Sequence, residues 1–273
     1  MIVLINMEPM VDIVVNTLPL CEKYRPKTLD DVISHSEVIK TLKKFITDST
    51  IPHLLFHGPP GTGKTTCILA LAKQVIGEQY KANILELNAS DDRGIDTVRD
   101  QIKTFCETQQ FQGKSMKFVI LDECDAMTGA AQSALRRIIE KYCATTRFFL
   151  TCNMITKIIP PIVSRCTRFK LPPLKRDVVA DRLMQIAKFE SLNLNIESAR
   201  AIYETSDGDM RKCMNILESC QMVSRDRKIT TELVYSCTGK PDPKSVKYIL
   251  NSLLNDTYDE CLKSIVLIRL YGI

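Results

Sequence analysis

The fold of this 273-residue chain is decided by one stretch, Gly58-Pro59-Pro60-Gly61-Thr62-Gly63-Lys64-Thr65-Thr66. It fits the phosphate-loop pattern, in which a glycine and four further residues precede Gly-Lys-Ser/Thr. Gly61 and Gly63 leave room for backbone N–H groups to turn towards a triphosphate. Lys64 brings positive charge to the β and γ phosphates, and Thr65 offers a hydroxyl to Mg²⁺, which prefers oxygen ligands. We therefore expect the whole stretch to bind the phosphates of ATP together with Mg²⁺.

The residues on either side of this stretch predict a strand before it and a helix after it. Residues 53–57 are typical of a short buried strand. Apolar residues keep helical spacing from Thr65 to Ile76, and Gly77 can end the helix. This order of elements points a helix N-terminus at the phosphates. The alternative is an ordinary glycine-rich turn, which needs neither a strand before it nor a helix after it.

Composition and length set the broad class of the protein. The chain is 45% apolar and 25% charged, as soluble globular proteins are, and its length predicts one large and one small domain. The net charge of +5 permits a polyanionic partner without arguing for one. The eleven cysteines form no Cys-x-x-Cys pair, so a metal site and a secreted disulfide scaffold are disfavoured. We expect free thiols in the cytosol or nucleus.

The pattern of apolar segments predicts an α/β domain followed by an all-α domain. The expected strands are 53–57, 83–88, 117–121, 147–151 and, at an edge, 168–171, and the helices between them include 36–46, 65–76 and 130–142. Pro172-Pro173 interrupts the pattern and predicts the domain boundary. Beyond it, 178–190, 196–205 and 209–222 predict helices without strands, and residues from Asp242 onward predict two more. Residues 1–20 are expected to be an extension, since they resemble neither a signal peptide nor a membrane span.

Polar residues follow two of the predicted strands directly. In a parallel sheet the carboxyl ends of the strands face the ligand crevice. Asp122 is therefore placed to hold Mg²⁺, and Glu123 to polarise an attacking water. Asn153 lies at the same edge, where an amide can orient water or contact the γ-phosphate. The alternatives are a solvated acidic turn and ordinary loop chemistry for the asparagine.

Two arginines have an open interpretation from the residues alone. Arg165 lies where it can act on the γ-phosphate of a neighbouring subunit, as an arginine finger does, or can form a surface salt bridge. Arg211 begins a helix of the second domain, where it can contact a γ-phosphate or remain a solvated helix end.

These motifs together resemble those of the AAA+ ATPases and, within them, the small subunits of replication factor C. The matching segments are Walker A at 58–65, Walker B at Asp122-Glu123-Cys124-Asp125, sensor one at Asn153, sensor two at Arg211, and the boxes Glu22-Lys23-Tyr24-Arg25-Pro26, 87–94 and Ser164-Arg165-Cys166. The resemblance covers roughly residues 21–265. It implies an AAA+ P-loop module with a parallel five-stranded sheet over residues 21–173, a helical lid over 174–238 and a helical collar beginning at 239.

The resemblance also implies partners and a location. Members of the family assemble as hetero-pentamers with other replication factor C subunits, open the ring-shaped sliding clamp PCNA and load it onto primer–template DNA in the nucleus. Arg165 would then complete the ATP site of a neighbour. Tyr24 and Arg25 would support the adenine pocket, and Asn88 would gate the Walker B glutamate when DNA arrives.

The resemblance further implies contacts to DNA along the helices after the second and third strands, and contacts to the clamp on the helix after the second strand. Arg93, Arg99 and Lys103 are the candidates for DNA backbone contact, and the alternative is a solvated helix face. Ile102 and Phe105 resemble the apolar plug that small subunits insert into the clamp. The alternative is helix core, because the same spacing serves both.

The sequence ends near the second of the collar helices that the family has, which leaves two further functions open. One is a nucleotide-binding regulatory form that stays outside the pentamer. The other is a stand-alone DNA-remodelling ATPase or helicase, suggested by the Asp-Glu-Cys-Asp string.

Overall fold

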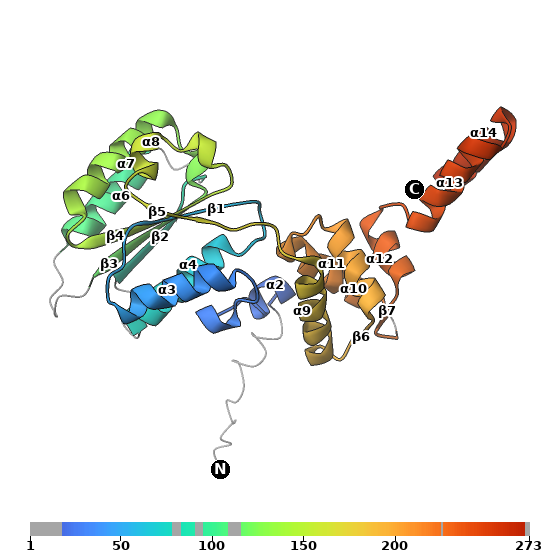
Figure 1. Cartoon of the computed structure of the whole chain (residues 1–273), viewed down its shortest axis with the longest axis horizontal. Helices are drawn as coiled ribbons and strands as arrows, with labels where there is room; N and C mark the ends of the chain where they lie inside the picture. The colour runs from blue at the N-terminus through green and yellow to red at the C-terminus, as the bar shows by residue number, and fades with distance from the viewer. Residues whose placement is uncertain (1–17, 78–82, 91–94, 109–115, 225, 271–273) are drawn as a thin grey trace, which may run out of the picture. The chain divides into compact units, whose positions relative to one another are not determined.

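The computed structural model describes residues 18–77, 83–90, 95–108, 116–224 and 226–270. The chain divides into two compact units (Figure 1). The first runs from Arg25 to Pro173. The second contains the described residues before Arg25 and those from Leu174 onward.

A five-stranded sheet forms the centre of the first unit. Its strands are β1 (Leu54–His57), β2 (Ile84–Asn88), β3 (Lys117–Asp122), β4 (Thr146–Cys152) and β5 (Thr167–Lys170), in the order β2-β3-β4-β1-β5 with parallel pairing throughout. The predicted five-stranded parallel sheet is confirmed, and β5 lies at an edge as expected. The strands end together at one edge, where the polar residues singled out above follow them.

Helices cover both faces of this sheet (Figure 1). Helices α3 (Ser36–Thr47) and α4 (Lys64–Ile76) lie on one face, and α6 (Ile95–Glu107), α7 (Gly129–Tyr142) and α8 (Pro160–Val163) lie on the other. Alternate residues of β3 enter the two cores: Phe118 and Ile120 pack on the α4 side, and Val119 and Leu121 on the α7 side. Burial on both faces explains why β1, β3 and β4 are mostly apolar runs in the sequence, whereas β2 and β5 are partly exposed. Single-turn 3₁₀ segments occur at Leu29–Asp31 (η1), Cys124–Ala126 (η3) and Ile155–Lys157 (η4).

The second unit is mainly helical. Its elements are α2 (Leu20–Lys23), α9 (Arg176–Phe189), α10 (Ile196–Thr205), α11 (Met210–Val223), α12 (Thr231–Thr238), α13 (Pro243–Asn255) and α14 (Tyr258–Leu270). The expectation that this part lacks strands is wrong, because β6 (Asn193–Leu194) pairs in parallel with β7 (Lys228–Ile229). Each strand has two residues, which is too short for the alternation of apolar and polar side chains to be visible in the sequence.

The segment before Arg25 belongs to the second unit. Leu20 is buried among the helices of that unit, and its backbone N–H donates to Glu218 Oε2 at 3.4 Å. Lys23 Nζ forms an ion pair with Glu190 Oε1 at 2.6 Å. The nucleotide-binding domain was expected to begin at residue 21, whereas these contacts tie residues 20–24 to α9 and α11.

Each of the eleven cysteines is a free thiol, and most are buried. Burial raises the pKa of Cys67 and of Cys166 to about 12, so both thiols remain protonated at neutral pH. They therefore behave as small apolar side chains. Within the part of the chain that the structure describes, no helix is both long and apolar enough to cross a membrane.

The close approach of β1 and β5 requires a glycine at position 58. A Cβ there would lie 2.1 Å from the carbonyl oxygen of Leu171, whose own N–H donates to His57 O at 2.8 Å. Gly58→Ala should therefore lower the free energy of unfolding by about 1–3 kcal/mol, measured by urea denaturation without nucleotide. Gly129→Ala is the control, since a Cβ at Gly129 meets nothing within 4 Å. Equal stability of the two variants would contradict this account.

Candidate functional site

The phosphate loop folds back on the ammonium group of Lys64. Gly61 and Gly63 have φ of 69° and 91°, conformations that glycine adopts without steric cost. Lys64 is the first residue of helix α4 and is only 8% exposed. Its Nζ donates to Gly58 O and Pro59 O, both at 2.9 Å, and to Asn153 Oδ1 at 2.8 Å. The structure thus brings the predicted lysine and the predicted sensor amide into direct contact.

The carboxylate of Asp122 joins three elements at the same edge of the sheet. Thr65 Oγ1 donates to Asp122 Oδ2 at 2.8 Å, and the Thr151 hydroxyl donates to Asp122 Oδ1. The start of α4, the end of β3 and the end of β4 therefore meet at one carboxylate. Thr65 and Asp122 are the two residues expected to hold Mg²⁺. Their adjacent hydroxyl and carboxylate oxygens fit a hard cation that takes its other ligands from phosphate and water.

Glu123 has a left-handed backbone, with φ 55° and ψ 42°. Such a conformation is uncommon for residues other than glycine, and it costs on the order of 1 kcal/mol or more unless neighbours enforce it. Here the Glu123 N–H donates to Asp122 Oδ1 and to Thr151 Oγ1, both at 3.1 Å. Glu123 is exposed, at the edge of the sheet where β3 ends.

Two residues of the site were missed by the sequence analysis. Thr151 is fully buried and bonds both Asp122 and Glu123. Asp125 Oδ2 accepts the backbone N–H groups of Asn153 and Met154, both at 3.2 Å, which fixes the loop that carries the sensor amide. The signal for Asp125 was present in the acidic string of Walker B. A threonine at the end of an apolar strand gives no distinguishing signal.

Asn88 ends β2, where its register partner is Asp122. The next residue, Ala89, donates its N–H to Asp122 O at 2.9 Å. The Asn88 side-chain oxygen accepts the N–H of Ser90 at 3.0 Å and its hydroxyl at 2.9 Å. The side chain of Asn88, the candidate switch residue, is therefore hydrogen-bonded within its own turn. It lies on β2, which is the strand next to the one that ends in Walker B.

Arg165 lies on the rim of the first unit, after α8. Its guanidinium donates to Pro161 O at 2.7 Å and pairs with Glu140 Oε1 at 2.5 Å. Arg136 Nε binds the same carboxylate oxygen at 3.0 Å, and hydrogen bonding from Arg136, with Arg165 adding, lowers the pKa of Glu140. The side chain of Arg165 is 35% exposed. A surface ion pair is thus present, and the arginine remains accessible from outside.

Three further residues were predicted to contact the nucleotide: Tyr24 and Arg25, which precede this site in the sequence, and Arg211, which follows it. Tyr24 donates its hydroxyl to Glu190 Oε1 at 2.5 Å, and its ring stacks on Phe189. Burial and then the Glu190 bond raise the pKa of Tyr24 to about 12. Arg25 is half-buried at the start of the first unit. Arg211 lies in the first turn of α11, where its N–H donates to the capping Asp209 Oδ1 at 2.8 Å and the residue is exposed.

The candidates for DNA and clamp contact divide into exposed and buried residues. Arg99 and Lys103 are exposed on α6, whereas Arg93 lies outside the described residues. Ile102 is 1% exposed and packs in the core against the sheet, so its side chain offers no surface to a clamp. Phe105 is half-buried, with Lys117 Nζ 5.3 Å from its ring centroid. For Ile102 the helix-core alternative holds, and we withdraw it as a clamp contact.

Comparison with known proteins places this geometry in a family. Residues 54–174 match the model of AAA, the ATPase family associated with various cellular activities. Replication factor C subunit 3 of Blastobotrys adeninivorans is 51% identical over 93% of this chain and 75% of its own length. Replication factor C subunit 3 of Saccharomyces cerevisiae is 48% identical, covering 88% and 72%, and subunit 5 of Homo sapiens is 46% identical, covering 92% and 74%.

A solved structure supports the fold independently. A single-substitution variant of Thermotoga maritima RuvB aligns with a TM-score of 0.62 at 19% identity, over 84% of this chain and 79% of RuvB. Identity at that level shows the fold alone. The replication factor C relatives, in contrast, match at about half of all positions over most of both sequences. The chain therefore belongs to the replication factor C subunit family and carries an AAA ATPase domain.

Proposed function

We propose that this chain is an ATP-binding small subunit of the replication factor C clamp loader. In that role it helps to open the sliding clamp PCNA and to place it on primer–template DNA during replication and repair in the nucleus. The observation that carries the proposal is the meeting of Lys64 with Asn153 and of Thr65 with Asp122, both at 2.8 Å, at one edge of the sheet. A lysine, a hydroxyl, a carboxylate and an amide at one point are the groups that phosphoryl transfer from ATP requires.

Each residue has a distinct part in this chemistry. The loop 58–66 surrounds the phosphates with backbone N–H groups, and Lys64 neutralises charge on the transferred group. Thr65 and Asp122 would hold Mg²⁺, which when bound adds positive charge to the β and γ phosphates. Glu123 polarises the attacking water, and Asn153 orients it. We assign Tyr24 and Arg25 to adenine binding and Arg211 to sensing the γ-phosphate, on the family resemblance.

We assign the contacts with partners on the family resemblance. Arg165 is accessible and is assigned to the γ-phosphate of the adjoining subunit in the hetero-pentamer. Arg99 and Lys103, together with Arg93, are assigned to the DNA backbone, Phe105 to the clamp, and Asn88 to control of Glu123. Among the described residues no observation favours the non-assembling form or a stand-alone remodelling ATPase.

Removing the loop lysine tests nucleotide binding directly. Lys64→Ala should weaken ATP binding by about tenfold to hundredfold, because a charge-assisted contact to phosphate is lost. Titration with a fluorescent ATP analogue measures the change. Lys73→Ala removes the same charge from an exposed position near the end of α4 and should leave binding unchanged. Unchanged binding in Lys64→Ala would refute the site.

Glu123→Gln separates binding from hydrolysis. The amide keeps the size of the side chain but cannot polarise water, so ATP should still bind while hydrolysis at this site slows by roughly 10²-fold. Single-turnover hydrolysis in the reconstituted complex measures this. Glu37→Gln, on the exposed start of α3, is the control. Loss of binding in Glu123→Gln would show that the carboxylate has a structural role instead.

Arg165→Ala tests the assignment to a neighbouring subunit. The change should slow hydrolysis by the assembled complex by about 10³-fold at the neighbour's site and leave ATP binding by this chain intact. The control is Arg136→Ala, since Arg136 shares Glu140 with Arg165 and should not affect hydrolysis. If Arg165→Ala abolished only this chain's own ATP binding, the assignment to the neighbour would be wrong.

A further inference from the structure

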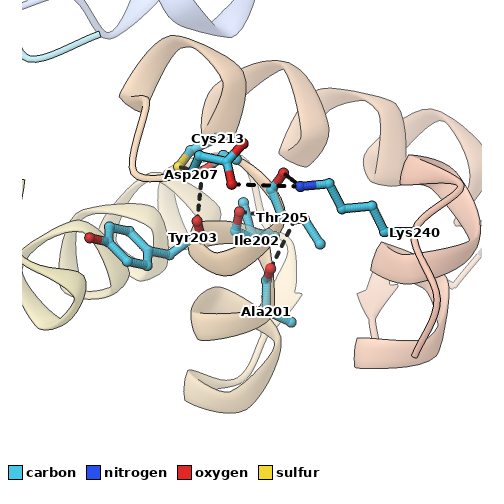
Figure 2. A network of polar contacts seen from close by, with 8 residues as sticks. Ala201, Ile202, Tyr203, Thr205, Asp207, Cys213 and Lys240 are labelled. Atoms are coloured by element: carbon cyan, nitrogen blue, oxygen red, sulfur yellow. Dashed lines mark hydrogen bonds and ion pairs between the residues drawn. The ribbon is translucent and has the colours of Figure 1, made fainter. Parts of the chain in front are cut away.

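Lys240 reaches from the link between α12 and α13 to the end of α10 (Figure 2). Its Nζ donates to the carbonyl oxygen of Thr205, the last residue of α10, at 2.7 Å. It also lies 3.8 Å from Asp207 Oδ1. Carbonyl groups at a helix C-terminus have no partner within the helix, and positive charge is favourable there. Lys240 therefore acts as a C-terminal cap that comes from a different part of the chain.

The cap is attached to the turn that positions Arg211. Asp207 and Gly208 follow α10 with φ of 57° and 76°, so the chain reverses through two left-handed residues. Asp209 then caps α11 by accepting the N–H groups of Arg211 at 2.8 Å and Lys212 at 3.3 Å. The carbonyl group of Thr205, which accepts the bond from Lys240, is thus joined to Arg211 by a short backbone segment that hydrogen bonds hold at both ends.

Side chains fix this turn to both helices. The Ser206 hydroxyl donates to Tyr203 O at 2.9 Å, and Ser206 Oγ lies 2.9 Å from Cys213 Sγ on α11. The Thr205 hydroxyl bonds back to Ala201 and Ile202 of α10 (Figure 2). Thr205 is therefore connected to the start of α11 through the buried polar contact between Ser206 and Cys213.

The turn packs on Tyr203 of α10, and this tyrosine is hydrogen-bonded to Leu174. Tyr203 Oη donates to the carbonyl oxygen of Leu174 at 2.8 Å. A Cβ on Gly208 would lie 3.2 Å from that hydroxyl, so the turn packs directly on the tyrosine. Leu174 is hence linked to the turn before Arg211 through Tyr203, and Lys240 is linked to it through Thr205 and Asp207.

Of the two contacts of Lys240, the hydrogen bond is the stronger. The ion pair with Asp207 joins side chains that are 45% and 76% exposed, and exposed pairs contribute little. Thr205 is only 7% exposed, and the bond to its carbonyl is charge-assisted. The position of the turn should therefore depend on the ammonium group and hardly on the aspartate.

We propose that Lys240 is a positioning residue for Arg211, and that through Thr205 it couples the orientation of α13 to sensing of the γ-phosphate. The proposal rests on the assignment of Arg211 given under the proposed function. It predicts that a change at residue 240 alters ATP binding more than ADP binding, because only ATP has the phosphate that Arg211 senses.

The test compares ATP and ADP dissociation constants for variants of the full chain. Lys240→Met, which keeps the apolar stem, should weaken ATP binding by roughly threefold to thirtyfold and leave ADP binding unchanged. Lys240→Arg should restore most of the affinity. Asp207→Asn and Lys244→Met, the latter an exposed lysine on α13, are controls that should match the unaltered chain. The ATP-to-ADP ratio does not depend on the folded fraction, so a loss of stability does not obscure the result.

A double variant separates failure of this proposal from failure of the proposed function. Arg211→Ala should weaken ATP binding, and adding Lys240→Met should weaken it no further. If Arg211→Ala lowers ATP affinity but Lys240→Met changes ATP and ADP binding equally or neither, Lys240 has no positioning role. If Arg211→Ala leaves ATP affinity unchanged, the assignment of Arg211 is wrong, and the role of Lys240 is refuted with it.

Discussion

The carboxylate of Asp122 is the group on which the rest of the site depends. It accepts hydroxyl bonds from Thr65 and Thr151 and a backbone bond from Glu123, and so joins α4, β3 and β4 at the edge of a sheet whose central strands are mostly apolar and buried. Polar groups in such surroundings are costly unless their partners are in place, so these bonds leave few alternative arrangements. The positions of Lys64 and Asn153, on either side, follow from the elements that this carboxylate connects.

The large elements of the fold were predictable because burial on both faces of a parallel sheet leaves a plain apolar signal. Segments such as 117–121 carry that signal along their whole length, and α10 was predicted with the boundaries that the structure has. The order β2-β3-β4-β1-β5 was not predictable, since nothing within a buried strand identifies its neighbour. Helix α3 was predicted over 36–46 and spans Ser36–Thr47, with His35 as its N-cap at φ 66°.

The sequence indicated those residues at the sheet edge whose spacing along the chain is fixed, and it did not indicate those that are joined to them only by contacts. The loop from Gly58 and the residues after β3 were found because their order along the chain is the signal. Thr151 and Asp125 act through bonds across the sheet edge, and their residue types are common in any loop or strand. Ile102 shows the opposite error: the spacing that predicts a plug on a helix surface also predicts a core position, and burial alone decides between them.

The left-handed backbone at Glu123 restricts which amino acids can occupy that position, apart from any requirement of catalysis. β-Branched side chains are excluded by steric conflict, and glycine, asparagine and aspartate, which tolerate this conformation best, lack the reach of a glutamate. The residue that is present is thus not one of those that this backbone conformation favours. The hydrogen bonds that the Glu123 N–H donates to Asp122 and Thr151 hold it in a conformation that its own residue type does not prefer.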